Sequence, residues 1–434
     1  MIPKIKEILQ VFNQNNIKYC VLRNYAFLLN QGDLGTDLDI SVDDSNWNNA
    51  EEILLNQGFN KSSKNFSLKH QGFWKYFPEN KKTFSFDLQK GGIYWNDIVY
   101  LKMNQILSGI ENKYFFPILS VNDSYLHYLC HSILGKRFFK HKYKEELVSL
   151  SQEDLNFSYI KSNLAQIFNK KIALFLLKNV QEGTFEKIER RMKFLASYYA
   201  FKDFKRAWTF TKLSARWFFS RKYCPLRKVP LLNLLMPSKP LISLIGPDGS
   251  GKSTMTEGLV SILKNNGYPV NLIYVGRGKK NIIPIKKIGN IYKGVEKKKK
   301  VGKNLKKIIY SLSSPIYTLD LLIRYLFIVL PKRKRFIVVT DRYCSDILLM
   351  KHVPFFLKRF FLSFFPKPSL TFYLYNDPNT LYNRKRDQSP EELSRQMGLF
   401  EQLSNNFEAN NVKTDNKELN LNAIVTKTLS FLNK

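Results

Sequence analysis

A glycine-rich segment in the second half of the chain has the residue types and spacing to bind phosphate. From Gly246 to Ser253 it reads G-x-x-x-x-G-K-S, after an apolar run at 241–245 and before a helical pattern. Glycine lets successive backbone N–H groups turn towards a phosphate chain, with the positive end of the next helix behind them. Lys252 would reach the β- and γ-phosphates and Ser253 would ligate Mg²⁺. We therefore expect ATP and Mg²⁺ to be held by Gly246, Gly249, Ser250, Gly251, Lys252, Ser253 and Thr254.

The elements that must position this loop alternate between strands and helices. Strands are predicted at 241–245, 270–276, 336–341 and 370–376, with helical patterns between them. Such alternation predicts an α/β domain, a parallel sheet with helices on both faces, whose ligands bind at the carboxyl ends of the strands. The residues that follow those ends are Arg277, Asp341–Arg342 and Asn376–Asp377, and an arginine-dense segment comes next at 383–396.

Three carboxylates in the first hundred residues form a second candidate site. Asp37 and Asp39 are two residues apart in a predicted strand at 36–42, so both lie on one face. Asp87 lies on the polar face of another predicted strand, at 83–89. Like charges side by side repel unless a cation lies between them. The layout is that of a two-metal nucleotidyl-transfer site, and a solvated acidic turn with an unrelated surface aspartate explains it equally well.

The length of the chain, 434 residues, is too great for one ordinary core. Four prolines between 225 and 240 mark a boundary. We predict an α+β domain at 1–120, a helical extension at 121–224, a linker at 225–238 and the α/β domain at 239–434.

The predicted helical extension carries two features that could bind ligands. His127 and His131 are four residues apart and share one helix face, as metal-binding pairs do. No glutamate follows His127 as in a zinc protease motif, and a basic loop follows the helix, so packing or phosphate contact is the favoured interpretation. The basic and aromatic segment at 205–222 suits either a membrane surface or a helix that covers the N-terminal domain.

The composition limits the class of protein. The hydrophobic content of 44% excludes a disordered chain, and the net charge of +34 predicts attraction to nucleic acid, anionic lipid or phosphorylated substrates. Four separated cysteines fit a reducing compartment. The first residues suit an amphipathic helix rather than a signal peptide. Asp320 and Arg324 interrupt the apolar stretch nearest to spanning length, at 315–330, and the phenylalanine-rich segment at 353–368 is expected to pack in the core. We expect a cytoplasmic protein, with peripheral contact at the anionic inner membrane surface as an open alternative.

The segment from 239 to 434 resembles the thymidylate kinase family of P-loop kinases. The resemblance rests on the phosphate loop GPDGSGKS, on DRYCS at 341–345 and on a lid-like RKRDQSPEELSRQ. It implies that Asp341 holds the Mg²⁺ water shell or the acceptor and that Arg342 and Arg277 grip an acceptor phosphate. It further implies that the lid residues Arg384 and Arg386 close on the transferring phosphoryl group. Asp248, by its own place inside the loop, is expected to orient an attacking hydroxyl.

One departure from the thymidylate kinase pattern bears on the substrate. The Glu-Pro-Gly-Gly that follows the second strand in true thymidylate kinases is absent, and residues 277–307 carry thirteen Lys or Arg against one Glu. This basic insert suggests an acceptor larger or more anionic than dTMP. A solvated tether is an equally good explanation of the insert.

The first hundred residues resemble bacterial proteins of the nucleotidyltransferase fold. LRNY, TDLDISV and FDLQ carry this resemblance, which implies metal ligation by Asp37, Asp39 and Asp87. Active members of that superfamily hold the triphosphate with a Gly-Ser pair, whereas this chain has Arg23-Asn24. Arg23 could replace the backbone cradle with a charged clamp, or the domain could bind without catalysing.

Three functions are compatible with the sequence. The first is an ATP-dependent phosphotransferase whose acceptor is an anionic, glycan or nucleotide metabolite. Its layout resembles kinase-like proteins of bacterial surface polysaccharide biosynthesis. The second is a nucleic-acid-associated or membrane-associated NTPase, and the third is a nucleotidyltransferase with a regulatory P-loop domain. Asp341-Arg342 and the lid arginines favour the kinase, because a switch needs no acceptor clamp, and nucleic acid is the less favoured partner. The sequence determines neither the acceptor nor the oligomeric state.

Overall fold

The computed structural model describes residues 1–434 except 30–34, 64–66, 220–238, 277–302, 351–352 and 434. The chain divides into two compact units, Met1–Tyr223 and Cys224–Leu432, each with its own sheet. The predicted linker at 225–238, Arg277 and most of the basic insert lie outside the described residues.

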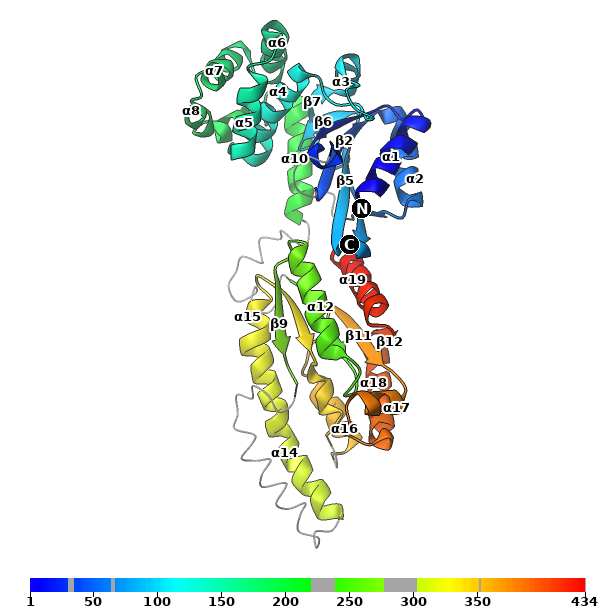
Figure 1. Ribbon diagram of the computed structural model, residues 1–434. Helices are drawn as coiled ribbons and strands as arrows, with labels where there is room; N and C mark the ends of the chain where they lie inside the picture. The colour runs from blue at the N-terminus through cyan, green and yellow to red at the C-terminus, as the bar shows by residue number, and fades with distance from the viewer. Residues whose placement is uncertain (30–34, 64–66, 220–238, 277–302, 351–352, 434) are drawn as a thin grey trace. The chain divides into compact units, whose positions relative to one another are not determined.

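The N-terminal unit is built on a five-stranded sheet in the order β1-β2-β5-β4-β3 (Figure 1). β2 and β5 are parallel neighbours, and the other pairs are antiparallel. Sequence patterns predicted β2 and β5. They missed β4, where buried Phe73 and Trp74 are consecutive and so break the alternation of a half-buried strand. The bounds are β1 (Tyr19–Arg23), β2 (Asp37–Val42), β3 (Asn60–Lys61), β4 (His70–Phe77) and β5 (Lys82–Lys90).

One face of this sheet is apolar and the other is polar. Phe84, Phe86 and Leu88 alternate along β5 and pack in one core with α1 (Ile2–Gln14) and α2 (Trp47–Asn56). Burial of each such side chain stabilises the unit by about 2 kcal/mol. The intervening residues of β5, including Asp87, therefore lie on the opposite face.

A hairpin and the helical extension lie on that opposite face. Ser41 of β2 donates a hydrogen bond to the carbonyl oxygen of Gly92, the first residue of the hairpin, at 3.1 Å. A separate core joins the hairpin to the helices. The elements are β6 (Gly92–Trp95), β7 (Ile98–Lys102), α3 (Met103–Gly109), α4 (Val121–Cys130), its continuation η4 (His131–Lys136), α5 (His141–Leu150), α6 (Phe157–Ile167), α7 (Lys170–Gln181), α8 (Phe185–Glu189), α9 (Met192–Ala200) and α10 (Phe204–Phe219).

The C-terminal unit is built on a parallel five-stranded sheet in the order β12-β11-β8-β10-β9 (Figure 1). The chain runs from the central β8 to the edge strand β9, returns to β10 beside β8, and then crosses to β11 and β12 on the other side. The direction of winding therefore reverses next to β8. This reversal is where such sheets bind ligands. The short, polar β12 was not predicted. The strands are β8 (Leu241–Ile245), β9 (Val270–Tyr274), β10 (Ile337–Asp341), β11 (Leu370–Tyr375) and β12 (Asn410–Lys413).

Helices pack on both faces of this sheet, as the alternating pattern predicts. Leu241 contacts a cluster that includes residues of α14 and η6, and Ile245 packs with residues of α18. On the other face α12 lies beside α19 (Figure 1). The side chain of Leu421 in α19 lies against Gly258 in α12. The helices are α12 (Lys252–Asn265), α14 (Lys303–Arg324), η6 (Tyr325–Val329), α15 (Leu330–Lys332), η7 (Cys344–Ile347), α16 (Phe355–Leu362), α17 (Pro378–Arg384), α18 (Pro390–Asn406) and α19 (Lys417–Asn433).

One helical segment differs from the expectation that no stretch is long enough to span a bilayer. Ser314–Lys332 is long and apolar enough by length and composition, and 44% of it is buried inside the structure. Asp320 and Arg324 of this segment do not face solvent. They form a buried ion pair at 2.7 Å, and Arg324 also donates to the carbonyl oxygen of Gly276 at 3.1 Å. This buried ion pair is part of the packing of the helix against the sheet of the C-terminal unit.

The phenylalanine-rich segment is only partly in the core. Phe361 and Phe365 are buried beside η6, as expected. In contrast, Phe356 and Phe360 are 73% and 56% exposed. The expectation was wrong for these residues because α16 has apolar side chains around most of its circumference, and only one stripe of a surface helix can face the sheet.

Candidate functional site

The phosphate loop requires glycine at the positions that the motif specifies. Gly246, Gly249 and Gly251 have φ angles of 149°, 81° and 80°, which side chains with a β-carbon rarely adopt. A β-carbon at Gly249 would also lie 2.6 Å from the carbonyl oxygen of Leu381, and one at Gly246 would overlap that of Leu374. The loop therefore lies directly against backbone at the end of β11 and in α17.

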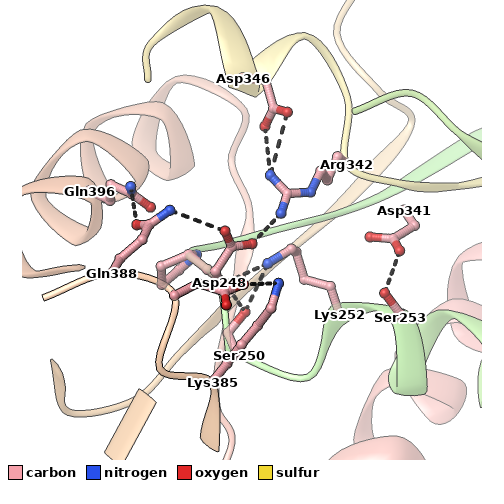
Figure 2. Close-up of polar contacts among 12 residues, drawn as sticks. Asp248, Ser250, Lys252, Ser253, Asp341, Arg342, Asp346, Lys385, Gln388 and Gln396 are labelled. Carbon is pink, nitrogen blue, oxygen red and sulfur yellow. Dashed lines mark hydrogen bonds and ion pairs between the residues drawn. The ribbon is translucent and has the colours of Figure 1, made fainter. Parts of the chain in front are cut away.

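The first turn of α12 presents the groups that a phosphate needs. The first N–H groups of a helix have no acceptor within the helix, so those of Lys252 and Ser253 are available to an anion. Lys252 Nζ lies across the loop and donates to the carbonyl oxygen of Pro247 (Figure 2). Burial, together with repulsion by Arg342, lowers the pKa of Lys252 to about 8. A bound anion would reverse part of that shift.

Ser253 and Asp341 together fit a Mg²⁺ site. The Ser253 hydroxyl donates to Asp341 Oδ2 at 2.6 Å, across the 88 residues that separate α12 from the end of β10 (Figure 2). Asp341 Oδ1 is buried and has no hydrogen-bond partner among the described residues. Hydroxyl, carboxylate and water oxygens are the ligands that Mg²⁺ prefers, and Mg²⁺ keeps much of its water shell. The free oxygen therefore fits the ion that the phosphate-loop motif requires.

Arg342 connects the loop to the end of β10. Its guanidinium pairs with Asp248 of the loop and contacts both carboxylate oxygens of Asp346 at 3.4 Å (Figure 2). Its backbone has a φ of 66°, in the left-handed region that few residues other than glycine adopt. Burial opposes ionisation of Asp248, but Arg342 and Lys252 outweigh it and keep the pKa of that carboxyl below its ordinary value. Asp248 is therefore a hydrogen-bond acceptor at neutral pH.

Two glutamines that sequence reasoning missed complete this network. Gln388 Nε2 donates to Asp248 Oδ2 at 3.2 Å, and Gln396 Nε2 donates to Gln388 Oε1 at 2.5 Å (Figure 2). Both lie in the lid-like segment at 383–396, for which the sequence analysis predicted arginines as the functional residues. Gln388 precedes α18 and Gln396 lies within it. Their eight-residue spacing was the signal in the sequence that could have indicated a contact between them.

The predicted lid arginines lie elsewhere. Arg384 donates to the hydroxyl and carbonyl oxygens of Thr414, at 3.0 and 2.6 Å, after β12. Arg386 is exposed. The structure thus brings Asp248, Lys252 and Arg342 together with Ser253 and Asp341, but it does not bring Arg384 or Arg386 to them. Arg277, the predicted acceptor ligand, lies outside the described residues.

The three N-terminal carboxylates lie together, as predicted. Asp39 and Asp87 are direct partners across the parallel β2–β5 pair, and Asp37 shares the face of Asp39. Arg23 donates to Asp39 at 2.7 and 3.3 Å, and Asn24 donates to Asp37 and Asp39 at 3.4 and 3.2 Å. The cation that relieves their repulsion here is thus a guanidinium.

Burial raises the pKa of Asp87 to about 6, and the charges of Asp39 and Asp37 contribute to the increase. Among the described residues no group of three or more His, Cys, Asp or Glu is placed to hold a metal ion. Metal ligation by Asp37, Asp39 and Asp87 therefore stays a prediction.

Comparison with known proteins covers the C-terminal unit. Residues 245–424 match the family model described as thymidylate kinase. A solved structure of thymidylate kinase from Ehrlichia chaffeensis is 16% identical to the chain with a TM-score of 0.31, over 45% of this chain and 98% of that one. No curated protein matches the chain. Residues 245–424 thus form a thymidylate kinase-like domain of the nucleotide kinase type.

Proposed function

We propose that the C-terminal unit transfers the γ-phosphoryl group of ATP to an anionic acceptor, with Mg²⁺ as the metal ion. The observation that carries this proposal is the pairing of Ser253 with Asp341, whose other, buried carboxylate oxygen has no hydrogen-bond partner among the described residues. A loop that only anchors phosphate does not need a second strand to present a carboxylate there. The match of residues 245–424 to the thymidylate kinase family supports the same reaction class.

The residues divide the work of phosphoryl transfer between positioning and charge. Mg²⁺ held by Ser253 and Asp341 would neutralise developing negative charge on the phosphates. The backbone N–H groups of the loop hold the phosphate chain in place. Lys252 exchanges the Pro247 carbonyl for a phosphate oxygen, and its positive charge stabilises the transferring group.

Asp248 and Arg342 form the acceptor side of the proposed site. Asp248 is ionised and can accept a hydrogen bond from an attacking hydroxyl. Arg342 keeps a planar fork of donors that suits an acceptor phosphate. Asp346 accepts from Nη1 of Arg342, whereas Asp248 accepts from Nη2. The guanidinium therefore stays in place when Asp248 changes partner.

The acceptor we propose is not dTMP but a larger or more anionic metabolite, such as a glycan or a nucleotide that carries phosphate. The absent Glu-Pro-Gly-Gly and the basic insert support this choice. A role in surface polysaccharide assembly rests on the resemblance of the two-domain layout alone.

Replacing Lys252 tests the proposed activity. Lys252→Ala should lower ATP-dependent turnover by two or more orders of magnitude, since one lost donor to a developing charge costs about 3 kcal/mol or more. Lys264→Ala removes an exposed lysine of the same helix and should change nothing. The assay measures phosphoryl transfer from labelled ATP to sugar phosphates, nucleoside monophosphates and dTMP. Equal turnover in the two variants contradicts the proposal, and dTMP as the best acceptor contradicts the acceptor class.

A second proposal concerns the N-terminal unit, where the register places Asp87 beside Asp39 on the polar face of the sheet. This juxtaposition favours a nucleotidyltransferase-like site with Asp37, Asp39 and Asp87 as metal ligands. Arg23 and Asn24 occupy the position of the usual Gly-Ser pair, so we expect weak binding of a triphosphate.

A further inference from the structure

A cavity of 780 Å³ lies in the N-terminal unit, between the polar face of its sheet and the helical extension. Its volume lies in the range of small-molecule sites. The sheet contributes Arg23 and Asp87, the α4–η4 helix contributes His127 and His131, and the hairpin contributes Trp95 and Tyr100. The cavity thus combines hydrogen-bonding groups with aromatic rings.

One donor of Arg23 has no partner in the ranges that the structure describes. Its Nε and Nη2 atoms are used by Asp39, whereas Nη1 is buried and has no partner within the described part of the chain. This bidentate pair with Asp39 uses only two of the five N–H donors of the guanidinium. A buried donor without an acceptor costs about 1–3 kcal/mol, so the unused edge of the guanidinium is a reason to expect a ligand.

His127 offers a second donor, and its neighbour fixes which nitrogen carries the proton. The ring is 1% exposed, and its Nδ1 lies 2.9 Å from the Tyr100 hydroxyl. That hydroxyl is buried and no other acceptor for it is found in the described ranges. Tyr100 therefore donates to Nδ1, and the neutral imidazole carries its proton on Nε2. His127 Nε2 has no partner among the described residues.

His131 adds to this arrangement one helical turn further on. Its Nε2 is also buried and has no partner in the part of the chain that the structure describes. The centroids of the two imidazole rings are 5.7 Å apart. Donors on Arg23 and His127, with His131 beside them, thus belong to side chains that line one cavity from two sides.

We propose that this cavity binds a phosphate monoester through Arg23, His127 and His131. A phosphate group presents several oxygens that only accept, which matches donors from separate elements better than a planar carboxylate does. Arg23 and Asp39 offset each other's charge, so Arg23 contributes to the site as a hydrogen-bond donor through Nη1. Asp87 can accept hydrogen bonds from hydroxyls of the ligand, and Trp95 and Tyr100 can contact a sugar or base ring. This site is independent of the phosphoryl transfer proposed for the C-terminal unit.

Histidine NMR of the full chain tests this site directly. The chain has five histidines, so the ring Cε1–H signals can be resolved and assigned with single His→Gln variants. Inorganic phosphate, glucose 1-phosphate and uridine monophosphate are titrated separately. We expect saturable shifts of the His127 and His131 signals and none at exposed His141, whatever binds at the phosphate loop. The ester that binds more tightly than inorganic phosphate identifies a sugar or a nucleoside as the source.

Two variants separate binding from folding. Arg23→Lys keeps the charge opposite Asp39 but loses the free edge of the guanidinium. The double variant Tyr100→Phe, His127→Phe removes a hydrogen-bonded pair together, so no buried partner is left unsatisfied; in it, the His131 signal reports binding. Each should weaken phosphate binding at least tenfold, with an unchanged melting temperature in the double variant. Unchanged affinity in both variants overturns the proposal, as does the absence of shifts. Shifts caused by Mg²⁺ alone and not by phosphate would also overturn it.

Discussion

At the scale of single residues, the candidate kinase site stores positive charge where phosphate should bind. Lys252 is buried beside Arg342, and the low pKa of Lys252 reflects burial first and this repulsion second. Asp248 pairs with Arg342 and also attracts Lys252. Its negative charge therefore reduces the repulsion between the two cations. A phosphate group would take over that neutralising role and release Asp248 for the acceptor.

The pKa of Lys252 leads to a prediction about pH. Phosphate favours the ammonium form, so it raises the pKa of Lys252 above the value of about 8 in the free protein. Below pH 8 the lysine is already charged, and ATP affinity should not change with its titration. Above pH 8 binding must take up a proton, so affinity should fall by up to about tenfold per pH unit. Fluorescence titration with ATP and Mg²⁺ between pH 7 and 9.5 measures this, within the range of the pKa.

Lys252→Arg is the matched control for this pH dependence. Arginine stays charged over the whole range, so the variant should bind ATP with an affinity that does not vary above pH 8, even where its absolute affinity is lower. The same decline in the arginine variant would assign the titration to another group.

The N-terminal carboxylates allow a second test at this scale. If Asp37, Asp39 and Asp87 bind Mn²⁺ in the folded state only, the melting temperature of the N-terminal unit should rise with Mn²⁺ concentration by mass action. The double variant Asp37→Asn, Asp39→Asn should lose this rise. Scanning calorimetry of the full chain without nucleotide measures both. A rise of equal size in the double variant would rule out these carboxylates as metal ligands. Arg23 would then be the cation that offsets their charge.

At the scale of elements, α14 is fastened to the sheet of the C-terminal unit by a buried charge pair. Asp320 is fully buried, Arg324 is 2% exposed, and Arg324 reaches the carbonyl oxygen of Gly276 just after β9. The pair thus fixes the helix beside the strand end from which the basic insert leaves. Burying both charges is costly in itself, and removing only one of them leaves the other unpaired.

Breaking this pair should destabilise the C-terminal unit. Arg324→Met should lower the free energy of unfolding by about 3–5 kcal/mol, because Asp320 would lose its buried ion-pair partner. The double variant Asp320→Leu, Arg324→Met should recover most of that loss. Arg335→Met, at an exposed position close by, is the control. Urea unfolding followed by circular dichroism gives the values, and a double variant no more stable than the single one would contradict this account.

At the scale of the whole molecule, the charge of +34 and the exposed phenylalanines of α16 are the features that the kinase site does not explain. Exposed charges act over about 8 Å at physiological ionic strength. The affinity of the chain for an anionic surface or a highly charged acceptor should therefore fall strongly as the salt concentration rises. Peripheral contact with an anionic membrane stays a prediction that this response can test.

Replacing Lys297–Lys300 by glutamine should reduce this salt response. We expect sedimentation with phosphatidylserine vesicles to fall with ionic strength in the unmodified chain and to fall less steeply in the variant, because fewer counterions are displaced. Lys142→Gln, which removes a single exposed lysine of α5, serves as a control. An identical salt slope in the fourfold variant would return the insert to the status of a tether.

The sequence by itself determined the phosphate loop and the parallel sheet of the C-terminal unit. Both follow from short-range patterns, since the loop is contiguous and strand–helix alternation is periodic. It also determined that Asp37 and Asp39 share a strand face, because side chains alternate along a strand. β4 and β12 were missed because neighbouring strands, rather than their own alternation, hold them in their sheets.

Only the tertiary structure decided which polar groups meet. Gln388 reaches Asp248 across 140 residues, and Arg384 turns to Thr414 instead of the loop. That Arg23 Nη1 and His127 Nε2 have no partner among the described residues also follows only from the tertiary structure. Spacing fixes contacts within one element, whereas contacts between elements depend on how strands and helices pack, and no local pattern in the chain records that packing.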